Sequence, residues 1–204
     1  MTPDRGDATT APAGGRENGG EPEAQPEVRL VKASPERLDE VKPLWFLLHR
    51  HHVSVADKRR GPVRSDEESW EIKRSWYAGW LAEEGAFLLL AEIDDKLVGY
   101  AVVRIAEPDP TPTWHMPPKK AEIEALSILP GVQRFGVGKL MIDAIKYEVN
   151  RQGVPFLTGA VIGGNSEAVR FYEREGGYVT YVKIDFCFEE GMPVPDPGVV
   201  DETG

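Results

Sequence analysis

The sequence LSILPGVQRFGVGKLMIDAI, from Leu126 to Ile145, decides how the rest of the chain is interpreted. It runs from the end of an apolar strand, through a turn rich in glycine, into a helix whose apolar residues recur every three or four positions. The first amides of a helix have no acceptor inside the helix and carry a partial positive charge, so they can bind a phosphate group. The stretch therefore predicts a phosphate site at the start of this helix.

Two common phosphate motifs do not fit this turn. A Walker A loop needs Ser or Thr after Gly-Lys, whereas Leu140 follows Gly138 and Lys139, and its first glycine is replaced by Gln133. A dinucleotide fingerprint needs a third glycine three residues after the second, where this chain has methionine. The pattern that does fit is Gln/Arg-x-x-Gly-x-Gly/Ala, which Gln133, Gly136 and Gly138 match.

The order of elements around the turn predicts the fold class. The expected strands are residues 28–33, 85–94, 97–107, 121–129, 155–163 and 178–188, with a hairpin turn at Asp94-Asp95-Lys96. The expected helices begin after Ser34, after Ser65, near Gly136 and at Asn165. This βααβββαβαβ order indicates a single α/β domain with one mixed, mostly antiparallel central sheet flanked by helices.

Local signals support these helices. Pro35 follows the cap Ser34, and Ser65 with Glu68 forms a capping-box pattern. Three apolar rows predict the buried helix faces: Leu38, Val41, Trp45 and Leu48; Ile72, Trp76 and Trp80; and Val137, Leu140, Met141, Ala144, Ile145 and Val149.

Charge and composition set the domain limits. The net charge of -10 belongs mainly to the ends, because residues 1–27 carry two bases and six acids and residues 189–204 carry five acids. We expect a disordered acidic tail over 1–27, a folded domain over 28–188 and a flexible acidic tail over 189–204. The nearly neutral domain argues against nucleic acid as a partner.

Cysteine usage and hydropathy predict the compartment. Cys187 is the only cysteine, which excludes an intramolecular disulfide and a cysteine-built zinc site, and no metal is expected. The apolar runs are too short to cross a membrane. We expect a cytoplasmic protein with no membrane partner.

Two motifs together resemble the GNAT superfamily of acyl-CoA-dependent N-acetyltransferases. AEIEALSILPGVQRFGVGKLMI resembles the central strand, turn and pyrophosphate helix of that family, and NSEAVRFYEREGGY resembles its N-x-x-A-x-x-F-Y-x-x-x-G helix. The resemblance covers roughly residues 28–188. It implies acetyl-CoA as co-substrate and transfer of the acetyl group to a primary amine in a ternary complex, without a covalent enzyme intermediate on Cys187.

The resemblance also implies which residues hold the cofactor. Amides of residues 134–139 would donate to the pyrophosphate, and the amide of Ile128 would face the thioester, with a bulge opening the sheet. The expected cofactor contacts are Leu126, Ser127, Ile128, Gln133, Arg134, Gly136, Val137, Gly138, Lys139, Asn165 and Tyr172. Gln133 replaces the family's first arginine. The alternative is that the glycines only make a tight turn.

Glu122, Glu124 and Tyr172 are the predicted catalytic residues. The two glutamates stand two apart on one strand, hence on one face. The resemblance implies a general-base glutamate on this strand, and Glu122 matches that position most readily, with Glu124 close behind. The alternative is a structural ion pair with Lys119, Arg104 or another base. Tyr172 would donate a proton to the leaving thiolate, and the alternatives are that it is packed core and that Asn165 is only a helix cap.

The acceptor is not named by the sequence. Five tryptophans and four histidines in the first two helices and the proline-rich loop could wall a pocket for a cationic amine, although core packing is the expected role of Trp76 and Trp80. His49 and His52 share a helix face but lack a third metal ligand. An acyl-CoA sensor without turnover is the second functional interpretation. The oligomeric state stays open, with a homodimer one possibility.

Overall fold

One five-stranded sheet forms the centre of the computed structural model, which describes residues 26–186. Its strands follow one another in chain order: β1 Arg29–Ala33, β2 Phe87–Ile93, β3 Lys96–Ala106, β4 Lys120–Ile128 and β5 Leu157–Gly159. The first four pair antiparallel, and β5 runs parallel to β4. The predicted α/β class, with a mixed and mostly antiparallel sheet, is confirmed.

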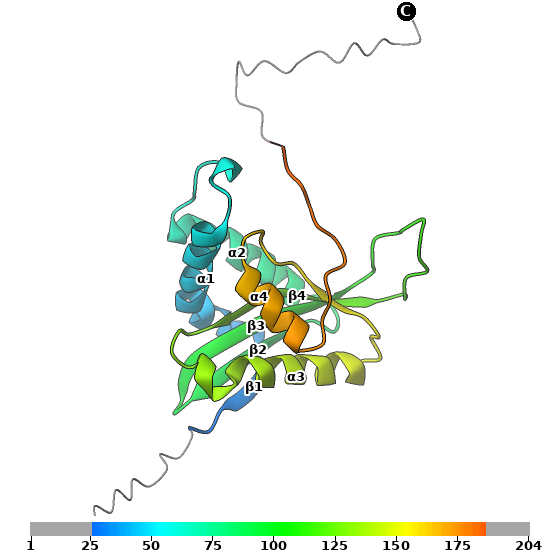
Figure 1. Ribbon diagram of the computed structural model, residues 1–204. Coiled ribbons are helices and arrows are strands. Elements are labelled where there is room, and N and C mark those ends of the chain that lie inside the picture. The colour runs from blue at the N-terminus through cyan, green and yellow to red at the C-terminus, as the bar shows by residue number, and fades with distance from the viewer. Residues whose placement is uncertain (1–25, 187–204) are drawn as a thin grey trace, which may run out of the picture.

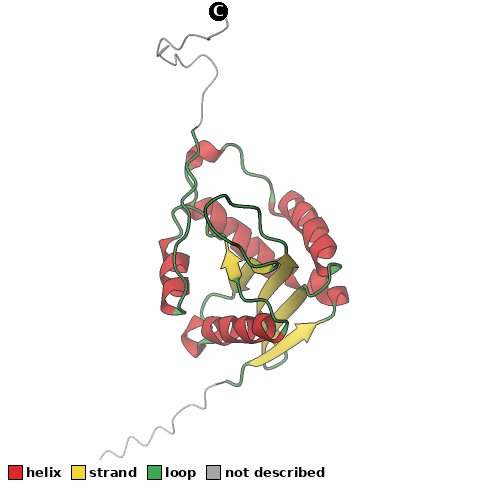
Figure 2. Cartoon of the chain, turned by 90° about the vertical axis from the view of Figure 1, so that its right-hand side faces the viewer, coloured by secondary structure: helices red, strands yellow, loops and turns green. Residues whose placement is uncertain are grey.

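Helices cover both faces of this sheet. They are η1 Pro35–Val41, α1 Lys42–Val55, η2 Lys58–Arg60, α2 Asp66–Leu81, η3 Gln133–Phe135, α3 Val137–Arg151 and α4 Ser166–Arg174. Leu88 and Leu90 of β2 pack under η1, α1 and α2, whereas Phe87 and Leu89 pack under α3. Every residue of β2 is buried, as expected for a strand covered on both faces. Figures 1 and 2 show the sheet between these two layers, with α4 beside α3.

The predicted helix starts at Ser34 and Ser65 are confirmed by their caps. Ser34 accepts a hydrogen bond from the amide of Glu36 and is followed by a 3-10 turn that continues into α1. Ser65 and Glu68 form the reciprocal capping box at the start of α2. The turn between β2 and β3 also matches, since Asp94 and Asp95 both have positive φ, as a two-residue hairpin turn requires.

Two predicted helix faces need correction. The buried face of α2 consists of Trp70, Tyr77 and Leu81, whereas Ile72 and Trp76 are exposed and Trp80 is only partly buried. Helix α2 carries apolar residues on more than one side, and the side that meets β3 is the one buried. In α3, Leu140 is exposed because it faces away from the sheet.

The predicted last strand, residues 178–188, is also wrong over its described part. Helix α4 ends in a Schellman motif, in which Gly176 has φ +88 and the amide of Gly177 donates to the carbonyl of Tyr172 over 2.8 Å. Residues 178–186 then continue without joining the sheet, and their large apolar side chains are 57–80% exposed. The alternating apolar pattern of these residues favours a strand. The edge strand β5 is only three residues long, so it offers little backbone for a further strand to pair with. Residues 187 and 188 lie outside the described part of the chain.

The described part of the chain has no helix with the length and hydropathy needed to span a bilayer.

Candidate active site

A bulge in β4 sets the position of the two predicted catalytic glutamates. Val102 of β3 pairs with Ala125, and the next residue, Val103, pairs with Ile123, so Glu124 is an extra residue with no partner on β3. A bulge of this kind bends a strand and turns its side chains. The bulge lies at Glu124, just before the stretch Leu126 to Leu129 that the resemblance places along the acyl-carrying arm.

The bulge reverses which residues of β4 face which helix layer. Before it, Ala121 and Ile123 pack with the α3 cluster. After it, Ala125 packs with the α1 and α2 cluster, and the hydroxyl of Ser127 donates to the carbonyl of Leu44 over 3.2 Å. The predicted cofactor residue Ser127 therefore points its side chain toward α1. Leu126 and Ile128 lie on the opposite side, against the α3 cluster.

Both glutamates form ion pairs. Nη1 of Arg104 lies 3.4 Å from Oε1 of Glu124, and Nζ of Lys120 lies 3.4 Å from Oε2 of Glu122. Arg104 also lies 3.9 Å from Glu83. The ion-pair alternative thus holds for both residues, with Lys120 in the place considered for Lys119. An ion pair does not exclude a catalytic role.

Burial raises the pKa of the Glu124 carboxyl above its usual range, and the negative charge of Glu122 raises it further. Lys73 and Arg104 oppose this rise. The Glu124 side chain is 14% exposed and that of Glu122 is 27% exposed. A partly buried carboxylate with a raised pKa is better suited than an ordinary one to accept a proton near neutral pH, which makes Glu124 the stronger candidate base.

The edge of β4 opens beyond the bulge. The pairs between β4 and β5 end at Ile123 and Gly159, so β4 has no partner strand on that side from Glu124 onward. On the other side the amide of Leu129 donates to the carbonyl of Val98 over 2.8 Å. Because successive amides of a strand point to opposite edges, the amide of Ile128 points toward the opened edge.

The start of α3 offers unpaired backbone donors. Gly136, in the left-handed conformation at φ +71, is the N-cap and provides no capping side chain. The first helical hydrogen bond runs from the amide of Leu140 to the carbonyl of Gly136, so the amides of Val137, Gly138 and Lys139 have no acceptor within the helix. Helices α2 and α4, in contrast, are capped by Ser65 and Asn165. The uncapped start of α3 suits an anion.

The structure narrows the predicted set of donors among residues 134–139. The amide of Phe135 donates to Val132, and that of Gly136 donates to Gln133, so both are already used within η3. The Lys139 ammonium lies 2.6 Å from Asp143 and 3.8 Å from Glu175. Any charge contact from Lys139 to a phosphate would compete with these two acids.

Glycine is favoured at positions 136 and 138 of the turn for two different structural reasons. A Cβ on Gly136 would meet open space, so glycine is favoured there by its positive φ. A Cβ on Gly138 would lie 3.1 Å from Phe171 and 3.2 Å from Ile128. Gly138 therefore lets α4 and β4 approach the start of α3, which brings the two sequence motifs together at one place.

Tyr172 lies on helix α4 and Asn165 caps its start, as predicted. The side-chain oxygen of Asn165 accepts a hydrogen bond from the amide of Ala168 over 3.1 Å, which confirms its capping role. Tyr172 packs against Phe171 with ring centroids 5.3 Å apart, and its hydroxyl has no hydrogen-bond partner among residues 26–186. Burial raises the pKa of Tyr172 to about 12, so the phenol is protonated at neutral pH and can act as a proton donor.

The histidine-rich end of α1 lies in the helix layer that α1 forms with α2. Nδ1 of His49 lies 2.9 Å from Asp66, and its ring stacks on Trp45. Burial and the neighbouring positive groups lower the pKa of His52 to about 4, so this ring is neutral at pH 7. No cluster of three or more potential metal ligands occurs within residues 26–186.

Lys73 and Arg104 were not assigned to the site from sequence. Lys73 lies among four aromatic rings of α1 and α2, and Arg104 lies over the Trp80 ring while it contacts Glu124. The spacing of Lys73, Trp76, Tyr77 and Trp80 at helical steps of three and four could have indicated this cluster.

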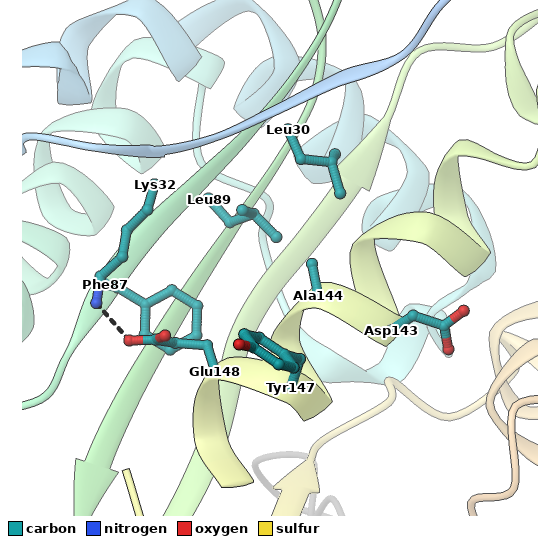
Figure 3. A pocket seen from close by; sticks show the side chains of 8 residues that line it. All are labelled: Leu30, Lys32, Phe87, Leu89, Asp143, Ala144, Tyr147 and Glu148. Atoms are coloured by element: carbon teal, nitrogen blue, oxygen red, sulfur yellow. Dashed lines mark hydrogen bonds and ion pairs between the residues drawn. The ribbon is translucent and has the colours of Figure 1, made fainter. Parts of the chain in front are cut away.

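Two hollows lie away from these residues. One, of about 420 Å³, is lined by β1, β2 and the middle of α3, where Lys32 and Glu148 lie 2.5 Å apart (Figure 3). None of the predicted site residues lines it. The other lies within the proline-rich loop, residues 107–118, where Trp114 meets Tyr181. Neither hollow includes residues from the start of α3. The candidate site is therefore defined by the open edge of β4 and the start of α3, not by a hollow.

Comparisons with known proteins show the family and the fold. Residues 51–178 match the Acetyltransferase (GNAT) family. Mycothiol acetyltransferase of Propionibacterium freudenreichii subsp. shermanii (strain ATCC 9614 / DSM 4902 / CIP 103027 / NCIMB 8099 / CIRM-BIA1) is 22% identical over 137 residues, which are 67% of this chain. The match spans only 40% of that relative's length.

Several solved structures share the fold. A tetramutant of the BH1408 protein from Bacillus halodurans is similar with a TM-score of 0.66 and 22% identity, over 78% of this chain and 99% of that one. A GCN5-related N-acetyltransferase from Ralstonia eutropha JMP134 has a TM-score of 0.63 and 16% identity, over 78% and 97%. The aminoglycoside N-acetyltransferase AAC(6')-Iy in complex with CoA has a TM-score of 0.60 and 16% identity, over 79% and 94%.

The family match covers more than half of the chain, and the fold, the bulged β4 and the uncapped start of α3 agree with it: the chain belongs to the GNAT acetyltransferase family.

Proposed function

We propose that this chain transfers the acetyl group of acetyl-CoA to a primary amine by direct attack in a ternary complex. One observation carries the proposal: the open edge of β4 and the uncapped start of α3 lie next to each other, because Gly138 of α3 packs against Ile128 of β4. The free amides of Val137, Gly138 and Lys139 can hold the pyrophosphate, with Gln133, Arg134 and the Gly136 turn beside them. Leu126, Ile128 and Asn165 can line the arm that carries the thioester.

The chemical roles follow from the groups at the opened edge. The amine nitrogen forms a bond to the acyl carbon, the C–S bond breaks, and the electron pair leaves on the thiolate sulfur. Glu124, with Glu122 beside it, takes the proton of the amine directly or through a water. Tyr172 gives its proton to the thiolate, and the amide of Ile128 can donate to the carbonyl oxygen as negative charge develops there.

The ligand is tested first. Thermal unfolding should be measured with acetyl-CoA, CoA, NAD and ATP, because a ligand at 100 times its dissociation constant adds about 2.7 kcal/mol to the free energy of unfolding. Acetyl-CoA and CoA should raise the melting temperature, and NAD should not. Stabilisation by ATP alone would refute the cofactor assignment. Thiol release from acetyl-CoA should then be followed with a panel of amines.

A sensor that binds acyl-CoA without turnover is the second candidate. The observation that favours it is that Glu122 and Glu124 are both held in ion pairs. The Glu122→Gln, Glu124→Gln and Tyr172→Phe variants together distinguish the two functions. An enzyme should lose turnover and keep its affinity for CoA. A sensor has no turnover to lose, so stabilisation by acetyl-CoA without acetylation of any amine would favour it.

A further inference from the structure

Lys73 lies in a cage of aromatic rings formed by α1 and α2. Its ammonium is 4.9–5.6 Å from the centroids of four rings, those of Trp45, Trp76, Tyr77 and Trp80. A cation at this distance from a ring is attracted by the negative face of the ring. The cage therefore fixes the ammonium in place without a carboxylate.

This cation differs from the others around Glu124. Arg104 contacts Glu124 and Glu83, and Lys120 contacts Glu122. Within residues 26–186, Lys73 has no ion pair within 4 Å and no hydrogen-bond acceptor. Burial lowers its pKa, and the negative charge of Glu124 opposes that change. A half-buried ammonium whose donors lack an acceptor favours an anionic partner.

The cage lies beside the candidate base. Trp80 connects the two, because the Lys73 ammonium and the Arg104 guanidinium lie 4.9 and 5.5 Å from its centroid, and Arg104 contacts Glu124. The electrostatic influence of Lys73 on the Glu124 carboxyl agrees with this proximity. A molecule whose amine reaches Glu124 therefore lies close to the Lys73 ammonium.

The filled cage changes the expectation for the acceptor. An aromatic-walled pocket next to carboxylates suits a cationic amine only when its rings are free. Here Lys73 already occupies the rings, so a second ammonium at that place would meet a like charge and lose the favourable ring contact. The cage thus selects against a simple polycation and toward a group of opposite charge.

We propose that Lys73 binds an anionic group of the acceptor, a carboxylate or a phosphate, while the acceptor's amine faces Glu124. This inference rests on the proposed N-acetyltransferase function and specifies its substrate class: amines that carry an anionic group. Lys73 is then a specificity-determining residue, fixed by aromatic rings, and is separate from the groups that move protons.

Matched acceptors test the proposal. β-Alanine is compared with β-alaninamide, and O-phosphoethanolamine with ethanolamine, by the ratio of kcat/KM within each pair. The ratios are compared between the wild type and Lys73→Met, so that the intrinsic reactivity of each amine cancels. We expect Lys73→Met to lower the anionic-to-neutral ratio by about tenfold or more in at least one pair. The affected pair shows whether the anion is a carboxylate or a phosphate.

Two variants control for structural damage. Lys73→Arg keeps a cation over the rings and should retain most of the preference, and Lys96→Met, at the exposed start of β3, should leave both ratios unchanged. Melting temperatures establish that each variant is folded. Ratios that are equal in the wild type and Lys73→Met for both pairs would overturn the inference, while acetylation itself would still support the proposed function.

A binding measurement keeps the inference testable if no amine is acetylated, which would count against the proposed function. Calorimetry of each acid and its neutral counterpart with the CoA-bound protein should show tighter binding of one acid, weakened about tenfold by Lys73→Met. Equal affinities in the two proteins, or binding of neither acid, would overturn the role of Lys73.

Discussion

The guanidinium of Arg104 lies 3.4 Å from the carboxylate of Glu124, although the strand register places Arg104 opposite Glu122. The bulge in β4 produces this diagonal contact, because Glu124 has no residue of β3 across from it. Glu124 thus lies between a positive neighbour, which lowers its pKa, and the negative Glu122, which raises it.

Substitution of these two neighbours should shift the acidic limb of the pH profile of kcat/KM in opposite directions. Glu122→Gln removes a negative charge, lowers the pKa of Glu124 and should move the limb to lower pH. Arg104→Gln removes a positive charge, raises the pKa of Glu124 and should move the limb to higher pH. Steady-state kinetics between pH 4.5 and 8 (a range of about 3.5 units) would measure both. Identical profiles for the two variants would exclude Glu124 as the base.

Tyr172→Phe should separate chemistry from folding. The hydroxyl has no hydrogen-bond partner among the described residues, so the free energy of unfolding should change by less than about 0.5 kcal/mol. Loss of a proton donor should lower kcat by about a hundredfold. Since the wild-type pKa is raised to about 12, no basic limb from this phenol is expected below pH 10, roughly two units lower.

The matched control is Tyr147→Phe, because Tyr147 is exposed on α3. It should leave kcat unchanged. Equal rates for Tyr172→Phe and the wild type would show that another group protonates the thiolate.

The two glycines of the turn should respond differently to substitution. Gly136→Ala places a side chain in the left-handed conformation and should cost about 1–2 kcal/mol of stability, whereas Gly136→Asn should cost less because asparagine tolerates that conformation. Gly138→Val would drive Phe171 and Ile128 apart, at about 1–3 kcal/mol, and should also weaken CoA binding. Denaturant unfolding and calorimetry with CoA measure both effects. Normal CoA affinity in Gly138→Val would argue against binding at the start of α3.

His52 should make stability fall with acidification. Its pKa in the folded chain is about 4, below the ordinary value of 6.5, so the unfolded chain takes up the proton first. The stabilisation is present above about pH 6.5 and is lost as the pH falls toward 4. Between pH 7 and 5, about two units, the wild type should lose about 1 kcal/mol more than His52→Gln, a figure reduced for partial solvent screening.

Thermal melts at both pH values would measure the difference, with His115→Gln in the exposed proline-rich loop as the control. If His52→Gln lost as much stability as the wild type, the buried ring would not be the titrating group.

Local features of the fold could be predicted from sequence. The Ser65–Glu68 capping box and the Asp94–Asp95 turn depend on hydrogen bonds and backbone angles within a few residues, and both formed as expected. The same holds for the cap at Asn165. The position of the Gly136 turn between β4 and α3 could also be predicted, because apolar periodicity fixes both elements.

Features that depend on distant partners could not be predicted. The bulge at Glu124 exists only relative to Val102 and Val103, which precede it by some twenty residues. The side of α2 that is buried was set by contact with β3, where the hydroxyls of Tyr77 and Tyr100 lie 3.2 Å apart. Trp76 and Trp80, which lie outside the buried face, form part of the aromatic surroundings of Lys73. An alternating apolar pattern, as in residues 178–186, forms a strand only where a neighbouring strand is available to pair with it.

The exposed segment 178–186, which follows α4 and belongs to no helix or strand, has a practical consequence for handling the protein. A protease that cleaves after aromatic residues meets Tyr178, Tyr181 and Phe186 in exposed backbone that belongs to no helix or strand. Trp76 and Tyr147 are exposed too, but they lie within helices. Brief chymotryptic digestion should therefore cut first at Tyr178, Tyr181 and Phe186, which shortens the chain, and at Trp114, which breaks the loop between β3 and β4. The helices and strands from β1 to α4 should resist further cutting.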